Sequence, residues 1–108
     1  MFTTARLFLF SKELDSAAKY IDIGISIAQK NNEESEIRNF RRQQAKLNYY
    51  LGNFQVAKDT LKKYFEKRKG LSLADDLFYL GMIEGEFGND IEKKSFFLSV
   101  DSIIKIKD

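Results

Sequence analysis

Apolar residues recur along this chain at steps of three and four, the spacing that places side chains on one face of an α-helix. The clearest series are Leu14, Ala17, Ala18, Ile21, Ile25 and Ala28, and Phe54, Ala57, Leu61, Tyr64 and Phe65. No segment shows the strict alternation of a half-buried strand over a strand's length. The pattern therefore predicts an all-α protein.

Glycine and asparagine divide this helical pattern, because the chain contains no Pro. Each boundary pairs a residue that ends a helix with one that can cap the next helix. The three pairs that show this are Asn31-Asn32 (before Glu33-Glu34), Gly52-Asn53 and Gly88-Asn89. We also take Gly70 as the residue that ends a helix, and Ser72 with Asp75 as a capping box that begins the next one. The prediction is six helices, at residues 2–11, 14–30, 33–51, 54–69, 72–87 and 90–106.

The predicted helices after residue 33 show a repeated pattern of residues. Gly52 and Gly88 are 36 residues apart, and small residues stand at matching distances from them. The matching pairs are Ala45 with Gly81, Ala57 with Lys93, and Leu61 with Phe97. Small side chains let two helices approach closely, and a large residue one turn further on fills the space beside them.

This arrangement resembles the tetratricopeptide repeat, whose signature is W-x2-L-G-x2-Y, A-x3-F and a closing P. The matching residues are Leu77, Leu80, Gly81 and Phe97 in the last hairpin, and Ala45, Gly52-Asn53-Phe54, Ala57 and Leu61 in the one before it. The chain departs from the signature by having no Trp and no Pro, with Asn48 and Glu84 in place of Tyr and Lys93 in place of Ala. The resemblance implies three antiparallel hairpins, 2–30, 33–69 and 72–106, stacked as a right-handed α-solenoid in one domain spanning 1–108.

In that family the first helix of each hairpin lines a concave groove that binds a protein segment or peptide. Carried over by position, the groove residues are Arg6, Asn39, Arg42, Gln43, Lys46, Tyr49, Asp75, Phe78, Tyr79 and Met82. Arg42 and Lys46 lie one turn apart, so both could meet one peptide carboxylate. The plainer interpretation, which we favour here, is a solvated basic helix face.

A weaker similarity links the chain to the tetratricopeptide segments of larger bacterial regulators, through the run Phe96-Phe97-Leu98-Ser99-Val100-Asp101-Ser102-Ile103. It favours a piece of a longer protein. It also offers an alternative function, a sensory or oligomerisation segment of a transcriptional or signalling regulator that associates with itself. Isoleucines at 103, 104 and 106 predict that another chain or further sequence covers the last helix.

Composition narrows the chemistry of this 108-residue chain. With no His and no Cys it can form no disulfide, no thiolate or imidazole metal site and no triad of the Ser-His-Asp or Cys-His kind. Its carboxylates show no EF-hand spacing, and we interpret them as aids to helix starts and solubility. We therefore expect no enzyme, no cofactor and no metal. No stretch is long and apolar enough to insert into a membrane. A cytoplasmic location is favoured over a periplasmic one, although the composition does not fix it.

Charge is distributed unevenly, although the net value is only +2. Residues 38–69 carry ten basic and two acidic side chains, and residues 72–92 carry six acidic and none that are basic. The basic stretch could bind nucleic acid phosphates, and Tyr49, Tyr50 and Tyr64 could stack on bases. Against this, we place Tyr64 in the core, and the acidic stretch would repel a phosphate backbone. A nucleic acid partner is thus disfavoured. The same asymmetry allows a homodimer in which the basic repeat of one copy faces the acidic repeat of another.

Overall fold

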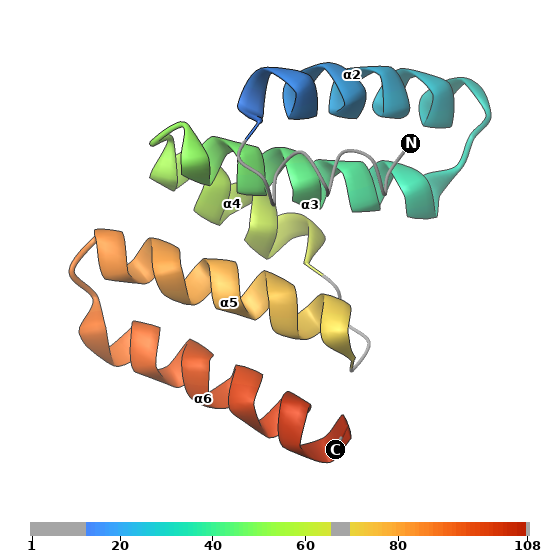
Figure 1. Ribbon diagram of the computed structural model, residues 1–108. Coiled ribbons are helices and arrows are strands. Elements are labelled where there is room, and N and C mark those ends of the chain that lie inside the picture. The colour runs from blue at the N-terminus through green and yellow to red at the C-terminus, as the bar shows by residue number, and fades with distance from the viewer. Residues whose placement is uncertain (1–12, 66–69, 108) are drawn as a thin grey trace. The chain divides into compact units, whose positions relative to one another are not determined.

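The computed structural model describes residues 13–65 and 70–107. Over these ranges the chain forms five α-helices and no strand (Figure 1), so the predicted all-α class is confirmed for this part of the chain. The helices are α2 (Leu14–Lys30), α3 (Glu34–Tyr50), α4 (Phe54–Tyr64), α5 (Leu71–Glu86) and α6 (Asp90–Lys107). The predicted helix at 2–11 lies outside the described residues, and so does Arg6.

Most helix ends lie within one residue of their predicted positions. The exception is α4, which ends at Tyr64 and not at residue 69. The prediction took Gly70 to be the residue that terminates α4, and this was wrong. Gly70 instead directly precedes α5, where its carbonyl accepts the first helical hydrogen bond, from the amide of Ala74. The capping box expected from Ser72 and Asp75 is also wrong, because α5 already begins at Leu71 and both residues lie inside it.

Three helix ends share one turn geometry. After α3 the amide of Gly52 donates to the carbonyl of Tyr49 and the amide of Asn53 donates to that of Asn48. These two bonds define a Schellman turn, which needs a left-handed residue at its centre. Gly52 has φ 84°, Gly88 takes the same place after α5 with φ 78°, and Asn32 does so after α2 with φ 56°. The predicted boundaries at these three places are confirmed.

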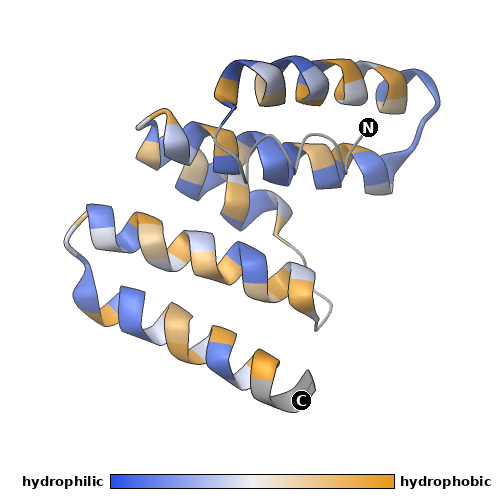
Figure 2. Ribbon diagram, viewed as in Figure 1, coloured by the Kyte–Doolittle hydropathy of each residue, from blue (hydrophilic) through white to orange (hydrophobic). Residues whose placement is uncertain are grey.

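The chain divides into two compact units, Met1–Tyr64 and Phe65–Asp108. In the first unit α3 packs against both α2 and α4, and in the second α5 packs along α6 as an antiparallel pair (Figure 1). Polar and apolar residues are interleaved along every helix (Figure 2), as expected of helices that bury one face and expose the other. The stacking of three hairpins into a solenoid within a single domain stays a prediction.

The first unit has a core between α2 and α3. Its buried members are Ala17, Ile21, Ile25, Phe40 and Leu47. Gly24 lies directly against the Phe40 ring, because a β-carbon added there would clash with Cζ of that ring. The missing side chain of Gly24 therefore makes the space that the Phe40 ring fills.

On its other side α3 meets α4, and the small residues of the repeat are buried there. These small residues are Ala45 on α3 and Ala57 on α4, and both are fully buried. The large residue that the repeat places one turn after Ala57, Leu61, is fully buried as well. The expectation that small residues stand where the helices pack is confirmed at these positions.

In the second unit the Phe97 ring of α6 covers Gly81 of α5. A β-carbon on Gly81 would lie 2.6 Å from Cε1 of Phe97, so the predicted match of a small residue with a large one is confirmed. Lys93 takes the place of Ala57 in this hairpin, and its side-chain Cδ lies 3.1 Å from the position of a β-carbon on Gly85. Gly85 thus gives room for a longer side chain where the repeat signature has a small one.

Candidate interaction surfaces

Three of the four polar residues expected to line a groove on α3 are buried, and the fourth, Asn39, is half-buried. Arg42, Gln43 and Lys46 expose 6%, 4% and 3% of their surface. The interpretation of Arg42 and Lys46 as part of a solvated basic face is therefore wrong, because helical spacing shows which residues share a face and not which face meets water. A guanidinium of Arg42 donates to the side-chain oxygen of Asn39, so two of the predicted groove residues bond to each other.

Tyr49, the last groove residue predicted on α3, belongs to an aromatic cluster at the turn into α4. Its ring centroid lies 5.3 Å from that of Tyr50 and 5.6 Å from that of Phe54. Tyr49 is half-buried. The three rings join the end of α3 to the start of α4, which is a packing role.

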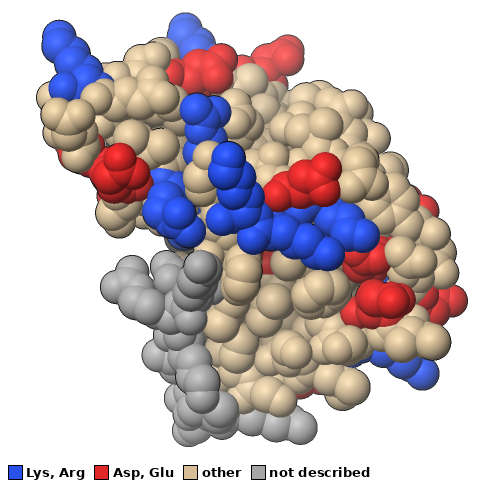
Figure 3. All heavy atoms as spheres, turned by 180° about the vertical axis from the view of Figure 1, so that it is seen from behind, with Lys and Arg blue, Asp and Glu red and all other residues tan. Residues whose placement is uncertain are grey.

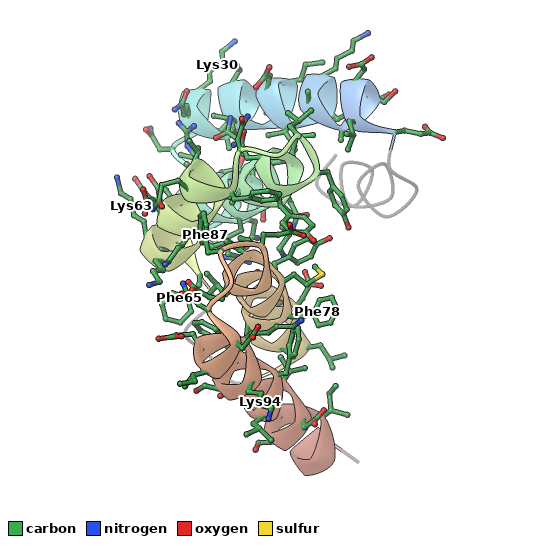
Figure 4. The ribbon with its side chains drawn as sticks, turned by 90° about the vertical axis from the view of Figure 1, so that its left-hand side faces the viewer. Lys30, Lys63, Phe65, Phe78, Phe87 and Lys94 are labelled. Carbon is green, nitrogen blue, oxygen red and sulfur yellow. The ribbon has the colours of Figure 1, made fainter. Side chains whose placement is uncertain are left out.

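The groove residues predicted on α5 lie together on a partly exposed face. Asp75, Phe78, Tyr79 and Met82 follow one another at helical spacing, and all four keep contact with solvent. Phe78 is 44% exposed. Figure 4 shows it pointing outward from the hairpin. The four groove residues predicted on α5 therefore share one face of the helix. We call Asp75, Phe78, Tyr79 and Met82 the α5 aromatic face.

The ring of Phe78 packs against two other aromatic rings. Its ring centroid lies 5.6 Å from that of Phe97 on α6, with 32° between the ring planes, and 6.3 Å from that of Tyr79 in an edge-to-face arrangement. Phe97 is the same residue that fills the space over Gly81. An exposed aromatic ring on a fixed support loses little conformational freedom when a partner binds it.

Two of the acidic residues interpreted as solubilising are buried. Asp76 is completely buried and Glu84 exposes only 2% of its surface, so that interpretation is wrong for both. Oε2 of Glu84 accepts a hydrogen bond of 2.6 Å from Nδ2 of Asn89 across the α5–α6 turn. No group of three His, Cys, Asp or Glu side chains among the described residues could hold a metal ion.

A basic cluster lies at the carboxyl end of α4. The ring of Tyr64 has the guanidinium carbon of Arg38 5.6 Å from its centroid and the ammonium nitrogen of Lys63 5.2 Å from it. Lys62 and Lys63 are exposed, and Lys63 projects outward from its helix (Figure 4). Tyr64 is half-buried, whereas sequence reasoning placed it in the core. The signal for this cluster was the run of basic residues beside an aromatic one.

The turn between α5 and α6 forms an acidic tip with apolar side chains. Every residue from Glu86 to Glu92 is exposed. Ile91 is 83% exposed and Phe87 41%, among three carboxylates: Glu86, Asp90 and Glu92. Such a combination of exposed apolar and charged groups is typical of surfaces that bind another macromolecule. We call residues 86–92 the acidic tip.

Comparison with protein-family models, with curated proteins and with solved structures finds no match for this chain. The resemblance to tetratricopeptide repeats therefore depends on the 36-residue repeat and the matching positions alone. In the described part of the chain no helix is long and apolar enough to cross a membrane.

Proposed function

We propose that the chain is a protein–protein interaction scaffold built from tetratricopeptide-like helix hairpins, which binds a protein segment or peptide. The proposal is supported by features that recur after 36 residues: the Schellman turn at Gly52 and Gly88, and the side-chain bond from Asn53 to Asn48 and from Asn89 to Glu84. Regular repetition of one supersecondary unit is the principle of helical repeat proteins, which commonly serve as binding surfaces.

The observation that carries the proposal is the α5 aromatic face. Phe78 is exposed and its ring is supported by Phe97, while Met82 lies one turn further along the same face. Aromatic residues on a firm support dominate the binding energy of many interfaces. Asp75 adds a partly exposed carboxylate to the same face, so the partner that this face fits is an apolar segment with Lys or Arg side chains.

Selection from a phage-displayed library of random dodecapeptides tests this proposal. We expect the chain to enrich peptides that combine aromatic or aliphatic residues with Lys or Arg. By fluorescence anisotropy, Phe78→Ala should weaken the enriched peptides about tenfold or more. Leu98→Ala is the matched control, because Leu98 is an exposed apolar residue on α6, and this change should leave the affinity unaltered.

Two outcomes of the selection contradict the proposal. The first is that the selection enriches no peptide more strongly than a parallel selection against an unrelated protein does. The other is a set of enriched peptides that bind the Phe78→Ala variant as tightly as the unchanged chain. Circular dichroism at 222 nm shows whether the variant keeps its helices, so a folding defect is recognised before affinities are compared.

A second candidate function is that of a self-associating segment of a larger regulator. It is favoured by a specific observation, the presence of the basic cluster around Tyr64 and of the acidic tip on the surface of the same chain. Opposite charges on one molecule allow copies of it to attract one another.

A further inference from the structure

We infer that the acidic tip of one copy binds the basic cluster at the end of α4 of a second copy. The inference rests on the second candidate function and deepens it by naming the two surfaces. It is independent of the α5 aromatic face, so peptide binding and self-association succeed or fail separately.

The basic side of this contact is a compact group of cations around one ring. Arg38 reaches Tyr64 from α3 and Lys63 reaches it from α4 itself, and Lys62 adds a further exposed ammonium group. Figure 3 shows Lys and Arg side chains gathered in a band across the surface of the first unit. The cations oriented by the Tyr64 ring offer a partner both positive charge and aromatic surface.

The acidic side has matching properties. It presents three exposed carboxylates around the apolar side chains of Phe87 and Ile91. The turn that carries them is fixed, because Gly88 and Asn89 close a Schellman turn and the Asn89 side chain bonds to the buried Glu84. A fixed loop pays little ordering entropy when it binds, so the tip is suited to insertion against a partner.

A second copy is the occupant that the charges favour. The tip needs a cationic surface with an apolar component, and the cluster needs an anionic one, and every copy of this chain carries both. Each exposed ion pair contributes little by itself, so attraction depends on several charges acting together with the burial of Phe87 and Ile91. The two patches are different surfaces, so two such contacts related by a two-fold axis give an isologous dimer, and one contact per pair of copies gives a heterologous open chain.

Sedimentation velocity of the complete chain at 50 mM and 500 mM NaCl tests this inference. We expect association at low salt that weakens about tenfold or more at high salt, because exposed charges are screened. The double variants Lys62→Glu/Lys63→Glu and Glu86→Lys/Asp90→Lys should each remain monomeric at low salt. The first variant keeps an unchanged acidic tip and the second keeps an unchanged basic cluster. A mixture of the two variants should therefore form a complex in which the tip of the first binds the basic cluster of the second.

Matched controls separate this contact from a general effect of net charge. Lys19→Glu/Lys30→Glu changes the net charge as much as the first variant, and Asp22→Lys/Asp101→Lys as much as the second, at exposed residues away from both patches. Both controls should associate like the unchanged chain. Circular dichroism confirms that each variant is folded.

Several results would overturn the inference. The first is that the unchanged chain is monomeric at 50 mM NaCl. The second is that the two patch variants associate as the unchanged chain does. The third is that the control variants lose association together with the patch variants. A further one is the absence of association together with binding of a 20-nucleotide single-stranded DNA that Lys62→Glu/Lys63→Glu abolishes, because this would assign the basic cluster to nucleic acid.

Discussion

The ring of Phe97 occupies the space that a side chain on Gly81 would need. An ideal β-carbon at residue 81 lies 2.6 Å from Cε1 of Phe97, far inside the van der Waals limit. Because Phe97 also supports Phe78, this single contact connects the packing of the α5–α6 hairpin to its exposed aromatic face. Packing and the proposed binding surface are therefore not independent in this unit.

Gly81→Ala should destabilise the α5–α6 hairpin. Alanine favours the helix by about 1 kcal/mol over glycine, but the clash with a ring that cannot bend should outweigh this by about 1–2 kcal/mol. Gly85→Ala is the matched control, because its β-carbon would meet the flexible Lys93 stem at 3.1 Å. This second change should be neutral or slightly stabilising. Urea denaturation followed by circular dichroism compares the two, and an equal response of both variants would contradict the explanation.

Gly52→Ala should lower the free energy of unfolding by about 1–2 kcal/mol, since a left-handed backbone disfavours any residue with a β-carbon. Apart from Gly52 and its two neighbours in the chain, no residue has an atom within 4 Å of a β-carbon on Gly52, so the effect isolates the backbone conformation. Asn32→Gly is the reverse experiment at the equivalent turn after α2, where φ is 56°. It should leave stability unchanged or raise it by a few tenths of a kcal/mol. Thermal denaturation of each variant measures these changes in stability. A Gly52→Ala protein as stable as the unchanged chain would be inconsistent with this explanation.

The helix boundaries could be predicted from the sequence because they depend on local chemistry. Gly52, Gly88 and Asn32 tolerate the left-handed conformation that a Schellman turn requires, and few other residues do. The prediction that Gly70 ends α4 was wrong because glycine is compatible with either end of a helix, and Gly70 directly precedes α5.

The candidate surfaces were harder to predict, because exposure depends on what packs above a helix. Arg42 and Phe78 illustrate this. The charged residue is buried and the aromatic one is exposed, which is the opposite of what their side chains favour. The resemblance to tetratricopeptide repeats placed both on the groove face, yet of the two only Phe78 is exposed. The pairing of Tyr64 with Arg38 could not be predicted from spacing, because it joins two helices.

Asn89→Ala should cost more stability than Asn53→Ala, although the two residues occupy the same place in the repeat. Asn89 donates at 2.6 Å to the carboxylate of Glu84, which is 2% exposed, whereas Asn53 donates at 3.2 Å to Asn48 at an exposed position. Losing a hydrogen bond to a buried carboxylate costs about 1.5–3 kcal/mol, and losing an exposed neutral one about 0.5 kcal/mol. Chemical denaturation of the two variants measures the difference. Equal losses would show that the Glu84 bond contributes no more than its exposed counterpart.

Two consecutive arginines on α3 provide the sharpest test of the buried polar face. Arg42 is buried and bonds to Asn39, whereas Arg41 is half-buried and bonds to Gln44 at 3.1 Å. Arg42→Gln should lower the free energy of unfolding by about 2–4 kcal/mol, because removing a buried charge leaves the polar groups around it without their partner. Arg41→Gln should change it by less than about 0.5 kcal/mol, as is usual for side chains near the surface. Both substitutions remove one positive charge from adjacent residues of one helix, so long-range electrostatics and helix propensity are matched. If the two variants unfold at the same urea concentration, the side chain of Arg42 is solvated, and the basic helix face first expected from the sequence is restored.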